Sequence, residues 1–545
     1  MTQSPSSHRG GKPARIGIFG WGVVAPGAKD MAAFRALLER GETALRPSPR
    51  AELGYGLFAV GDPDFRFEEY APWVASRHGE GYVARMRSKM GENVLFSVGA
   101  MVQALGCDER LEGLLRELDG RCHIYVGSGV GDLPESYRAA TDLARALRVW
   151  NHFWAEPARC EARRRYAAEG VAPGGAEAPP DPAALPVDSD ERWQALGAWD
   201  AFWASHSDAL AAFTARYAEI ERLDFDEAEG PGGAPTSAIH KRQRAHRKLI
   251  DEVGCPKPPW AAVDSDLIWN IQNVPSSQLS MLLGVHGPAW ATVGACSAFG
   301  VSLKCGIDAI RRGEASAVIV GTTDPRPDPA LVGAFHQARV MPGTGEVNFP
   351  LTSLRGTHVS GGACLWIIGD ADYFEARGLR PVGGYVAAAT VSSDAEHIIT
   401  PSKTGPKRAI DHAFAEAGIG PGDVAIADLH ATGTPGDINE LALLESYLGP
   451  QTLVTARKGV FGHGMANCGG WELTALALSL REGFAFPTGI PEGALNRRVR
   501  EARGDTVVTS GRPVRRGYGI KTMLGIGGIT ACVILKAADG EPEPA

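Results

Sequence analysis

The segment ATVGACSAFGVSLKCGIDAIRRG, residues 291–313, changes from a short apolar, β-prone run into a helical pattern. Four apolar residues spaced three or four apart predict one buried helix face: Phe299, Leu303, Ile307 and Ile310. Gly313 supplies the stop, and Cys296 falls at the start of this helix. A helix N-terminus favours a thiolate nucleophile. The alternative is a buried cysteine that packs as a small hydrophobic residue.

Composition indicates a globular protein without a nucleic-acid or membrane surface. Of the 545 residues, 44% are hydrophobic and 22% charged, and the net charge of −8 favours neither polyanion. The polar N-terminus is not a signal peptide, and the longest stretch without charged residues, 267–303, contains Asn270, Gln272 and Pro275, so no membrane span is expected. Nine scattered cysteines without a C-x-x-C pair predict free thiols in the cytoplasm and no metal site.

Strands and helices alternate along most of the chain, which predicts an α/β architecture with much parallel sheet. The first half begins with a strand and glycine loop in residues 15–30 and a helix in 31–41. Further predicted elements are a helix in 91–106, strands in 121–132, 316–324, 362–370, 424–437, 452–463 and 530–537, and a helix in 406–418.

Residues 133–266 differ from the rest and predict a mostly helical insertion with two Pro/Gly loops, 170–186 and 229–235. The insertion has five tryptophans that could build a small satellite core or contact a partner or a ligand: Trp150, Trp154, Trp193, Trp199 and Trp203. Its basic run HKRQRAHRK, residues 240–248, is either a docking patch for an acidic partner or a solvated helix face.

Two further segments place histidines beside glycine loops that follow apolar strands, where α/β folds collect functional residues. DLHATGTPGDINE, residues 428–440, contains His430, and Thr432 and Thr434 follow this histidine in the loop. RKGVFGHGMANCGGWE, residues 457–472, contains Lys458, His463 and Glu472 at its end. Each histidine taken alone is more often structural than catalytic.

Taken together, these segments resemble the β-ketoacyl synthases, the condensing enzymes of fatty-acid and polyketide assembly. GACSAFG resembles the family's nucleophile motif, HATGTPGD its HGTGT-x-x-x-D motif, and KGVFGH its K-x-x-x-GH motif. The opening strand and helix and the closing segment MLGIGGITACVIL, residues 523–535, match in family order. The resemblance spans residues 15–536, apart from the insertion.

The resemblance implies a thiolase-like fold of five α-β-α-β-α layers built from two similar halves. The N-terminal half with the nucleophile would comprise residues 15–132 and 267–370, and the C-terminal half with the histidines residues 371–537. The family is usually homodimeric and takes its substrates from the phosphopantetheine arm of an acyl carrier protein or from CoA, without a bound cofactor.

Site roles are also implied by the resemblance. Cys296 would accept the acyl group, while His430 and His463 would stabilise the enolate formed when a malonyl-type thioester loses carbon dioxide. Lys458 would keep both histidines neutral, and with Glu472 it would orient them.

The same resemblance assigns the remaining binding groups. The backbone N–H groups of Cys296 and Ile526 would form the oxyanion hole. Thr432 and Thr434 would hold the phosphopantetheine amides, although turn hydrogen bonding is the alternative for both threonines.

The chain departs from the family at two places that bear on substrate choice. Ile526 replaces the usual phenylalanine of the closing loop, which changes the gate of the acyl pocket. In LRGTHVSGGAC, residues 354–364, Thr357 stands for the usual aromatic residue and Gly361 for a glutamate, which predicts space near the site. His358 is expected at the surface.

The departures leave two alternatives to a decarboxylating synthase. One is a thiolase-fold acyltransferase that does not decarboxylate. The other is a non-catalytic partner subunit of the chain-length-factor kind, which usually lacks the cysteine that this chain has at position 296.

Overall fold

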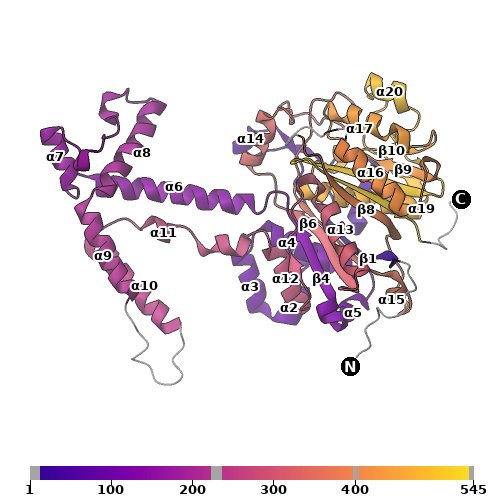
Figure 1. Ribbon diagram of the computed structural model, residues 1–545, viewed down its shortest axis with the longest axis horizontal. Coiled ribbons are helices and arrows are strands. Elements are labelled where there is room, and N and C mark those ends of the chain that lie inside the picture. The colour runs from indigo at the N-terminus through magenta and orange to yellow at the C-terminus, as the bar shows by residue number, and fades with distance from the viewer. Residues whose placement is uncertain (1–12, 223–235, 397–401, 403, 539–545) are drawn as a thin grey trace. The chain divides into compact units, whose positions relative to one another are not determined.

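The computed structural model describes residues 13–222, 236–396, 402 and 404–538. They divide into two compact units, one of residues 135–267 and one that holds the rest (Figure 1). The predicted loop at 229–235 lies outside the described residues.

The larger unit is built on ten strands in the order β10-β9-β13-β14-β8-β1-β7-β6-β4-β5. Their bounds are β1 Ile16–Val24, β4 Cys122–Gly127, β5 Ala289–Trp290, β6 Ala317–Asp324, β7 Gly362–Asp370, β8 Tyr385–Ser393, β9 Val424–Asp428, β10 Leu453–Thr455, β13 Tyr518–Gly525 and β14 Ile529–Lys536. Two small ribbons pair β2 Arg46–Pro47 with β3 Ala59–Val60, and β11 Phe484–Ala485 with β12 Arg512–Pro513.

The ten strands form two halves with the same pairing pattern. In β5-β4-β6-β7-β1 and in β10-β9-β13-β14-β8, three parallel strands are followed by two antiparallel ones. The halves join through β1 and β8 at only two residue pairs, Ile16 with Val386 and Gly17 with Tyr385. The repeated pattern confirms the predicted pair of similar α/β halves, and the sheet is mixed rather than mainly parallel.

Helices cover and separate the two halves. The helices of this unit are α1 Met31–Arg40, α2 Ala71–His78, α3 Glu80–Lys89, α4 Glu92–Leu105, α5 Leu111–Leu118, α12 Val274–Leu283, α13 Ala298–Arg311, α14 Pro329–Gln337, α15 Ala371–Glu375, α16 Thr404–Ala417, α17 Gly436–Leu444, α18 Lys458–Phe461, α19 Cys468–Glu482 and α20 Arg497–Arg503.

Three helical layers follow from the contacts of these helices. α4 and α12 pack on the first half, α16 packs on β8 and β14 of the second half, and α13 and α19 contact strands of both (Figure 1). The apolar face predicted for residues 298–311 is buried because α13 lies in this central layer. The five layers of the thiolase-like fold are therefore present.

Two predicted strands are shorter than expected. β9 ends at Asp428: the N–H of Leu429 still donates to the Thr455 carbonyl at 2.9 Å, but the N–H groups of residues 430–432 bond to the side chains of Glu440 and Asp437. β10 ends at Thr455, and the chain then turns into the short helix α18. These early ends leave His430 in a loop and Lys458 at the first residue of α18, both outside the sheet.

The smaller unit is helical and packs around aromatic side chains. Its helices are α6 Leu133–Ala155, which begins just before the unit, α7 Glu161–Glu169, α8 Asp190–Ser205, α9 Asp208–Arg222, α10 Thr236–Val253 and α11 Pro259–Ala262. Four of the five predicted tryptophans are buried, in agreement with a satellite core: Trp150, Trp154, Trp199 and Trp203. Trp193 is exposed.

The basic run at 240–248 lies on α10 and has two sides. His246 is buried and stacks on Tyr217 with ring centroids 3.8 Å apart. Arg244, Arg247 and Lys248 are exposed. Only part of the run is therefore available to a partner.

Candidate active site

Cys296 lies in a tight turn at the N-terminus of the central helix α13. The preceding residue, Ala295, has φ of 47°, a left-handed conformation that is costly for a residue with a Cβ atom. The second half repeats this turn, because Met465 has φ of 49° and precedes α19 in the same way. The two central helices thus present equivalent N-terminal turns, and these turns contact each other.

The closing loop is attached to the cysteine turn. The hydroxyl of Ser297 donates to the carbonyls of Met523, at 2.9 Å, and Ile529, at 2.8 Å. Those residues flank the glycine loop between β13 and β14, which carries Ile526. The backbone N–H groups of Ile526 and Cys296 both lie near enough to the Cys296 thiol to lower its pKa. The structure therefore brings together the two N–H groups that the sequence predicts as an oxyanion hole.

Without a bound substrate, the side chain of Cys296 is a neutral thiol, whereas its position at the helix N-terminus predicts a thiolate. Burial raises the pKa of Cys296 to about 11, although Lys458 and the two backbone N–H groups oppose the increase. Only 7% of the residue is exposed, so the cost of burying a charged sulfur outweighs the favourable dipole.

His430 follows β9 and is held through its main chain. Its N–H donates to Glu440 Oε1 at 2.7 Å, and its carbonyl accepts a hydrogen bond from Lys458 Nζ. Burial first, and then Lys458, His463 and Lys521, lower the pKa of His430 well below its ordinary value. Among the described residues its Nδ1 has no hydrogen-bond partner, so one ring nitrogen is left for a bound ligand.

His463 is fixed next to it, with the two ring centroids 5.7 Å apart. Its Nδ1 accepts from the N–H of Met465 at 3.2 Å, which leaves the proton on Nε2. Burial and Lys458 lower the pKa of His463 to about 3. As expected from the sequence, both imidazoles are neutral, and burial contributes more to this than the lysine.

Lys458 and Glu472 form a buried ion pair, with Nζ 2.7 Å from Oε1. The other oxygen of Glu472 pairs with Lys521 Nζ, also at 2.7 Å. Lys521 also lies 3.0 Å from Asp428, which in turn pairs with Arg457 at 3.3 Å. The predicted pair is thus one end of a larger buried network.

Several buried charged residues of this region were absent from the sequence-based prediction. Asp324 ends β6 and accepts hydrogen bonds from Ser128 Oγ at 2.7 Å and from the N–H of Ala466 at 2.8 Å, which fixes the turn before α19. Burial raises the pKa of Asp324 to about 6. Two signals could have found such groups: a carboxylate at a strand end, as in Asp324, and a lysine within an apolar strand, as in Lys521.

Thr432 and Thr434 lie in a loop organised by Asp437. Their Oγ1 atoms are 3.0 Å apart, and Asp437 Oδ1 accepts from the N–H of Thr432 at 2.9 Å and of Thr434 at 3.3 Å. The Thr434 hydroxyl also accepts from the N–H of Gly436 at 3.3 Å, so it takes part in the turn, whereas the half-buried Thr432 hydroxyl contacts only that of Thr434.

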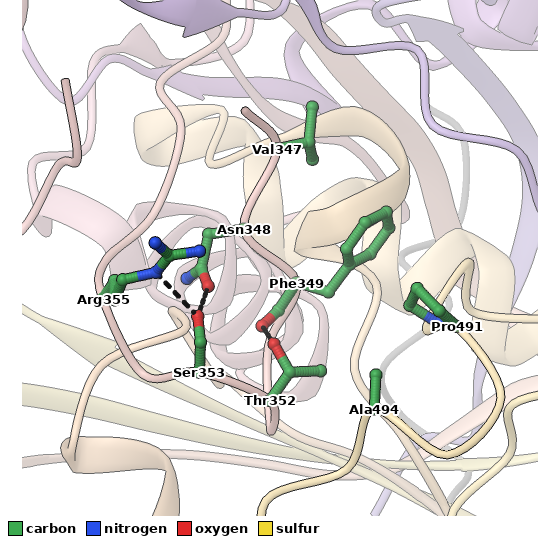
Figure 2. A pocket seen from close by; sticks show the side chains of 8 residues that line it. All are labelled: Val347, Asn348, Phe349, Thr352, Ser353, Arg355, Pro491 and Ala494. Carbon is green, nitrogen blue, oxygen red and sulfur yellow. Dashed lines mark hydrogen bonds between the residues drawn. The ribbon is translucent and has the colours of Figure 1, made fainter. Parts of the chain in front are cut away.

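A surface pocket of about 250 Å³ lies beside this loop (Figure 2). Eight residues line it: Val347, Asn348, Phe349, Thr352, Ser353, Arg355, Pro491 and Ala494. The amide of Asn348 donates to the Gly433 carbonyl at 3.2 Å, between the two threonines. None of the predicted site residues lines the pocket itself.

The segment around Thr357 corrects two expectations. His358 is buried, not at the surface: Nε2 accepts from the N–H of Asn348 at 2.8 Å, and Nδ1 donates to the Ala59 carbonyl at 3.0 Å. Gly361 opens no space, because a Cβ atom there would meet the Pro325 carbonyl oxygen at 2.2 Å. Thr357 is buried. Two residues later, Val359 forms a parallel β-bridge with His463.

No cluster of three metal-ligating side chains occurs in the part of the chain that the structure describes. Likewise, none of the described helices combines the length and the apolar character that a membrane span requires. All nine cysteines are free thiols.

Comparison with known proteins agrees with this site. Residues 241–368 match the family model "Beta-ketoacyl synthase, N-terminal domain", and residues 384–489 match "Beta-ketoacyl synthase, C-terminal domain". The chain is 30% identical over 331 residues to 3-oxoacyl-[acyl-carrier-protein] synthase 2 of Staphylococcus aureus (strain COL), which covers 58% of this chain and 75% of the synthase.

Solved ketosynthases have the same fold at low identity. A β-ketoacyl synthase from Burkholderia phymatum STM815 superposes with a TM-score of 0.65 at 15% identity, over 96% of this chain and all of that one. A type II polyketide ketosynthase solved with its acyl carrier protein, AntDE:AntF, gives 0.61 at 15% identity, over 97% of this chain and all of that one.

The chain belongs to the β-ketoacyl synthase family. It is a transferase that carries out the β-ketoacyl synthase condensation of fatty-acid or polyketide biosynthesis.

Proposed function

We propose that Cys296, His430 and His463 carry out this condensation by decarboxylation of a malonyl-type thioester. The observation that carries the proposal is one buried cysteine facing two N–H groups, beside two neutral histidines held by Lys458 and Glu472. Neutral imidazoles can donate to a developing enolate oxygen without an ionisation step, and each such donor contributes about 3 kcal/mol in a buried site.

The reaction proceeds in two halves. Cys296 Sγ attacks the acyl thioester, the bond from carbonyl to carrier sulfur breaks, and the thiol proton leaves with the carrier thiol. The malonyl thioester then loses carbon dioxide, and the electron pair of the broken C–C bond forms an enolate that accepts hydrogen bonds from the two histidines. The enolate carbon attacks the Cys296 thioester, and the cysteine thiolate leaves and takes up a proton.

The oxyanion of both tetrahedral intermediates is stabilised by the backbone N–H groups of Cys296 and Ile526. The high pKa of the free thiol implies that its proton is lost as the thioester binds, not beforehand. Thr432 and Thr434 hold the amides of the phosphopantetheine arm, and the branched side chain of Ile526, 47% exposed, gates the acyl pocket.

An acyl carrier protein delivers both substrates in this proposal. The support is the solved ketosynthase with its acyl carrier protein, together with the exposed arginines of α10, which suit an acidic partner. Free thiols at all nine cysteines fit a cytoplasmic protein.

A homodimer is the proposed assembly. β5 lies at the edge of the ten-stranded sheet, and three apolar residues on or beside it are exposed: Met281, Trp290 and Val293. An open sheet edge flanked by apolar side chains favours pairing with a second copy.

The function is tested by incubating the protein with acyl-carrier-protein and CoA thioesters and measuring intact mass. We expect an acyl adduct on the wild type and on Cys532→Ala, a buried cysteine of β14, but none on Cys296→Ala. Addition of the malonyl thioester should then release carbon dioxide and a β-ketoacyl product. Acylation without carbon dioxide would support the non-decarboxylating acyltransferase, and no adduct from any donor would support the partner subunit.

A further inference from the structure

Strand β13 places a fully buried lysine against the end of β9. Lys521 Nζ donates to the Leu429 carbonyl at 2.7 Å and pairs with Glu472 Oε2 at 2.7 Å and Asp428 Oδ1 at 3.0 Å. One hydrogen bond to a carbonyl and two carboxylates at ion-pair distance therefore surround the ammonium group. A buried lysine without such partners is costly.

The main chain that carries His430 is held from both sides by this arrangement. Lys521 binds the carbonyl of residue 429 and Lys458 the carbonyl of residue 430, and one carboxylate, Glu472, joins the two lysines. From the opposite direction, Glu440 accepts from the N–H groups of residues 430 and 431 and from the Thr522 hydroxyl at 2.5 Å.

The same strand continues into the oxyanion loop. Lys521 and Thr522 are separated by only a few residues from Gly525, where the hairpin to β14 begins. β13 therefore connects the loop that faces Cys296 with the main chain of His430, through side chains that point into the same buried network.

The charges around His430 are close to balance. The cations are Lys458 from α18, Lys521 from β13 and Arg457, and the anions are Glu472 from α19, Glu440 from α17 and Asp428 from β9. The ring of His463 also faces it, with the two centroids 5.7 Å apart. Loss of one cation would leave an excess of buried negative charge beside the imidazole.

We propose that Lys521 is a positioning residue for decarboxylation, which fixes the main chain of His430 and keeps its imidazole neutral. The inference rests on the proposed role of His430. Lys521 is among the groups that lower the pKa of His430 and of His463, after burial and Lys458.

The test compares Lys521→Met and Lys521→Gln with the wild type. We expect malonyl-thioester decarboxylation at pH 8 to fall ~10-fold or more in Lys521→Met, while acylation of Cys296 stays within ~3-fold, because only the decarboxylation uses the histidines. In the pH dependence of the decarboxylation rate, the acid limb should shift to higher pH by about one unit. The reason is that the imidazole gains a proton more readily beside unpaired carboxylates.

Three further variants distinguish the effect of the lysine's charge from a general loss of stability. Lys521→Met/Asp428→Asn removes the cation together with one anion, so its acid limb should move back toward the wild type. Lys521→Gln can still donate to the Leu429 carbonyl and should shift the limb with a smaller loss of kcat. Arg503→Met is the control for lost stability, because it removes a buried arginine that pairs with Glu445. It should not shift the acid limb.

The outcomes are distinct. An unmoved acid limb in folded Lys521→Met and Lys521→Gln, or no recovery in the double variant, would overturn the inference. Wild-type protein that acylates Cys296 but never decarboxylates would instead overturn the proposed function on which it rests.

Discussion

At the scale of single residues, burial decides the protonation of this site more than neighbouring charges do. Three of the buried histidines, His358, His430 and His463, have a lowered pKa with burial as the largest cause. For Cys296 the same effect has the opposite sign, because the charged form of a thiol is the deprotonated one. One dry environment therefore keeps both the nucleophile and its histidine partners neutral.

His358 allows this to be measured away from the chemistry. Burial lowers the pKa of His358 to about 4, so between pH 6.5 and 4 the unfolded chain binds a proton that the folded protein does not. The stability contribution is complete above pH 6.5 and is lost as the pH falls toward 4, by ~3 kcal/mol in total.

We expect the free energy of unfolding to fall less steeply over this range in His358→Gln than in the wild type, as measured by urea denaturation at successive pH values. Asp324 and Asp437, whose pKa burial raises to about 6, act in the opposite direction and cancel in the comparison. Equal slopes for the two proteins would contradict the assignment.

At the scale of elements, the site depends on strands that end early and on paired helix starts. Just after β9, Glu440 and Asp437 bond the N–H groups of residues 430–432, and α13 and α19 both begin after a left-handed residue. Helix α10 differs from these elements because its charged side chains Arg244, Arg247 and Lys248 are exposed to solvent.

The α10 prediction concerns the carrier protein. Arg244→Glu/Arg247→Glu should raise KM for acyl-carrier-protein substrates ~10-fold at low salt and less at high salt, because the attraction is between solvent-exposed charges. Kinetics with pantetheine thioesters should be unchanged. The matched double reversal Arg164→Glu/Arg165→Glu on α7 should change neither, and equal effects from both pairs would rule out a specific docking role for α10.

At the scale of the whole molecule, the sheet edge at β5 is the proposed interface of the homodimer. We expect Val293→Arg, at an exposed position beside this edge, to shift the protein from dimer to monomer, because a buried guanidinium without a partner is costly. Mass photometry at nanomolar concentration measures the shift. Val187→Arg, which charges an equally exposed valine of the helical unit, is the control, and a dimer in both variants would place the interface elsewhere.

The sequence by itself determined the alternation of strands and helices over much of the chain, the helix behind Cys296 and the two histidine loops, but not strands β8 and β13. Local patterns suffice for these, since apolar spacing and glycine positions act over a few residues. It also carried enough family motifs to predict the thiolase-like fold and the condensing reaction.

Only the tertiary structure decided how those residues are poised. The helical pattern at 298–311 predicts a dipole that lowers the pKa of Cys296, whereas burial between the two halves of the sheet raises it. Lys521 and Asp428 give no local sign of being partners, and His358 gives none of being buried. Desolvation and ion pairing depend on which distant segments exclude water together, and that is a property of the folded chain, not of any short stretch within it.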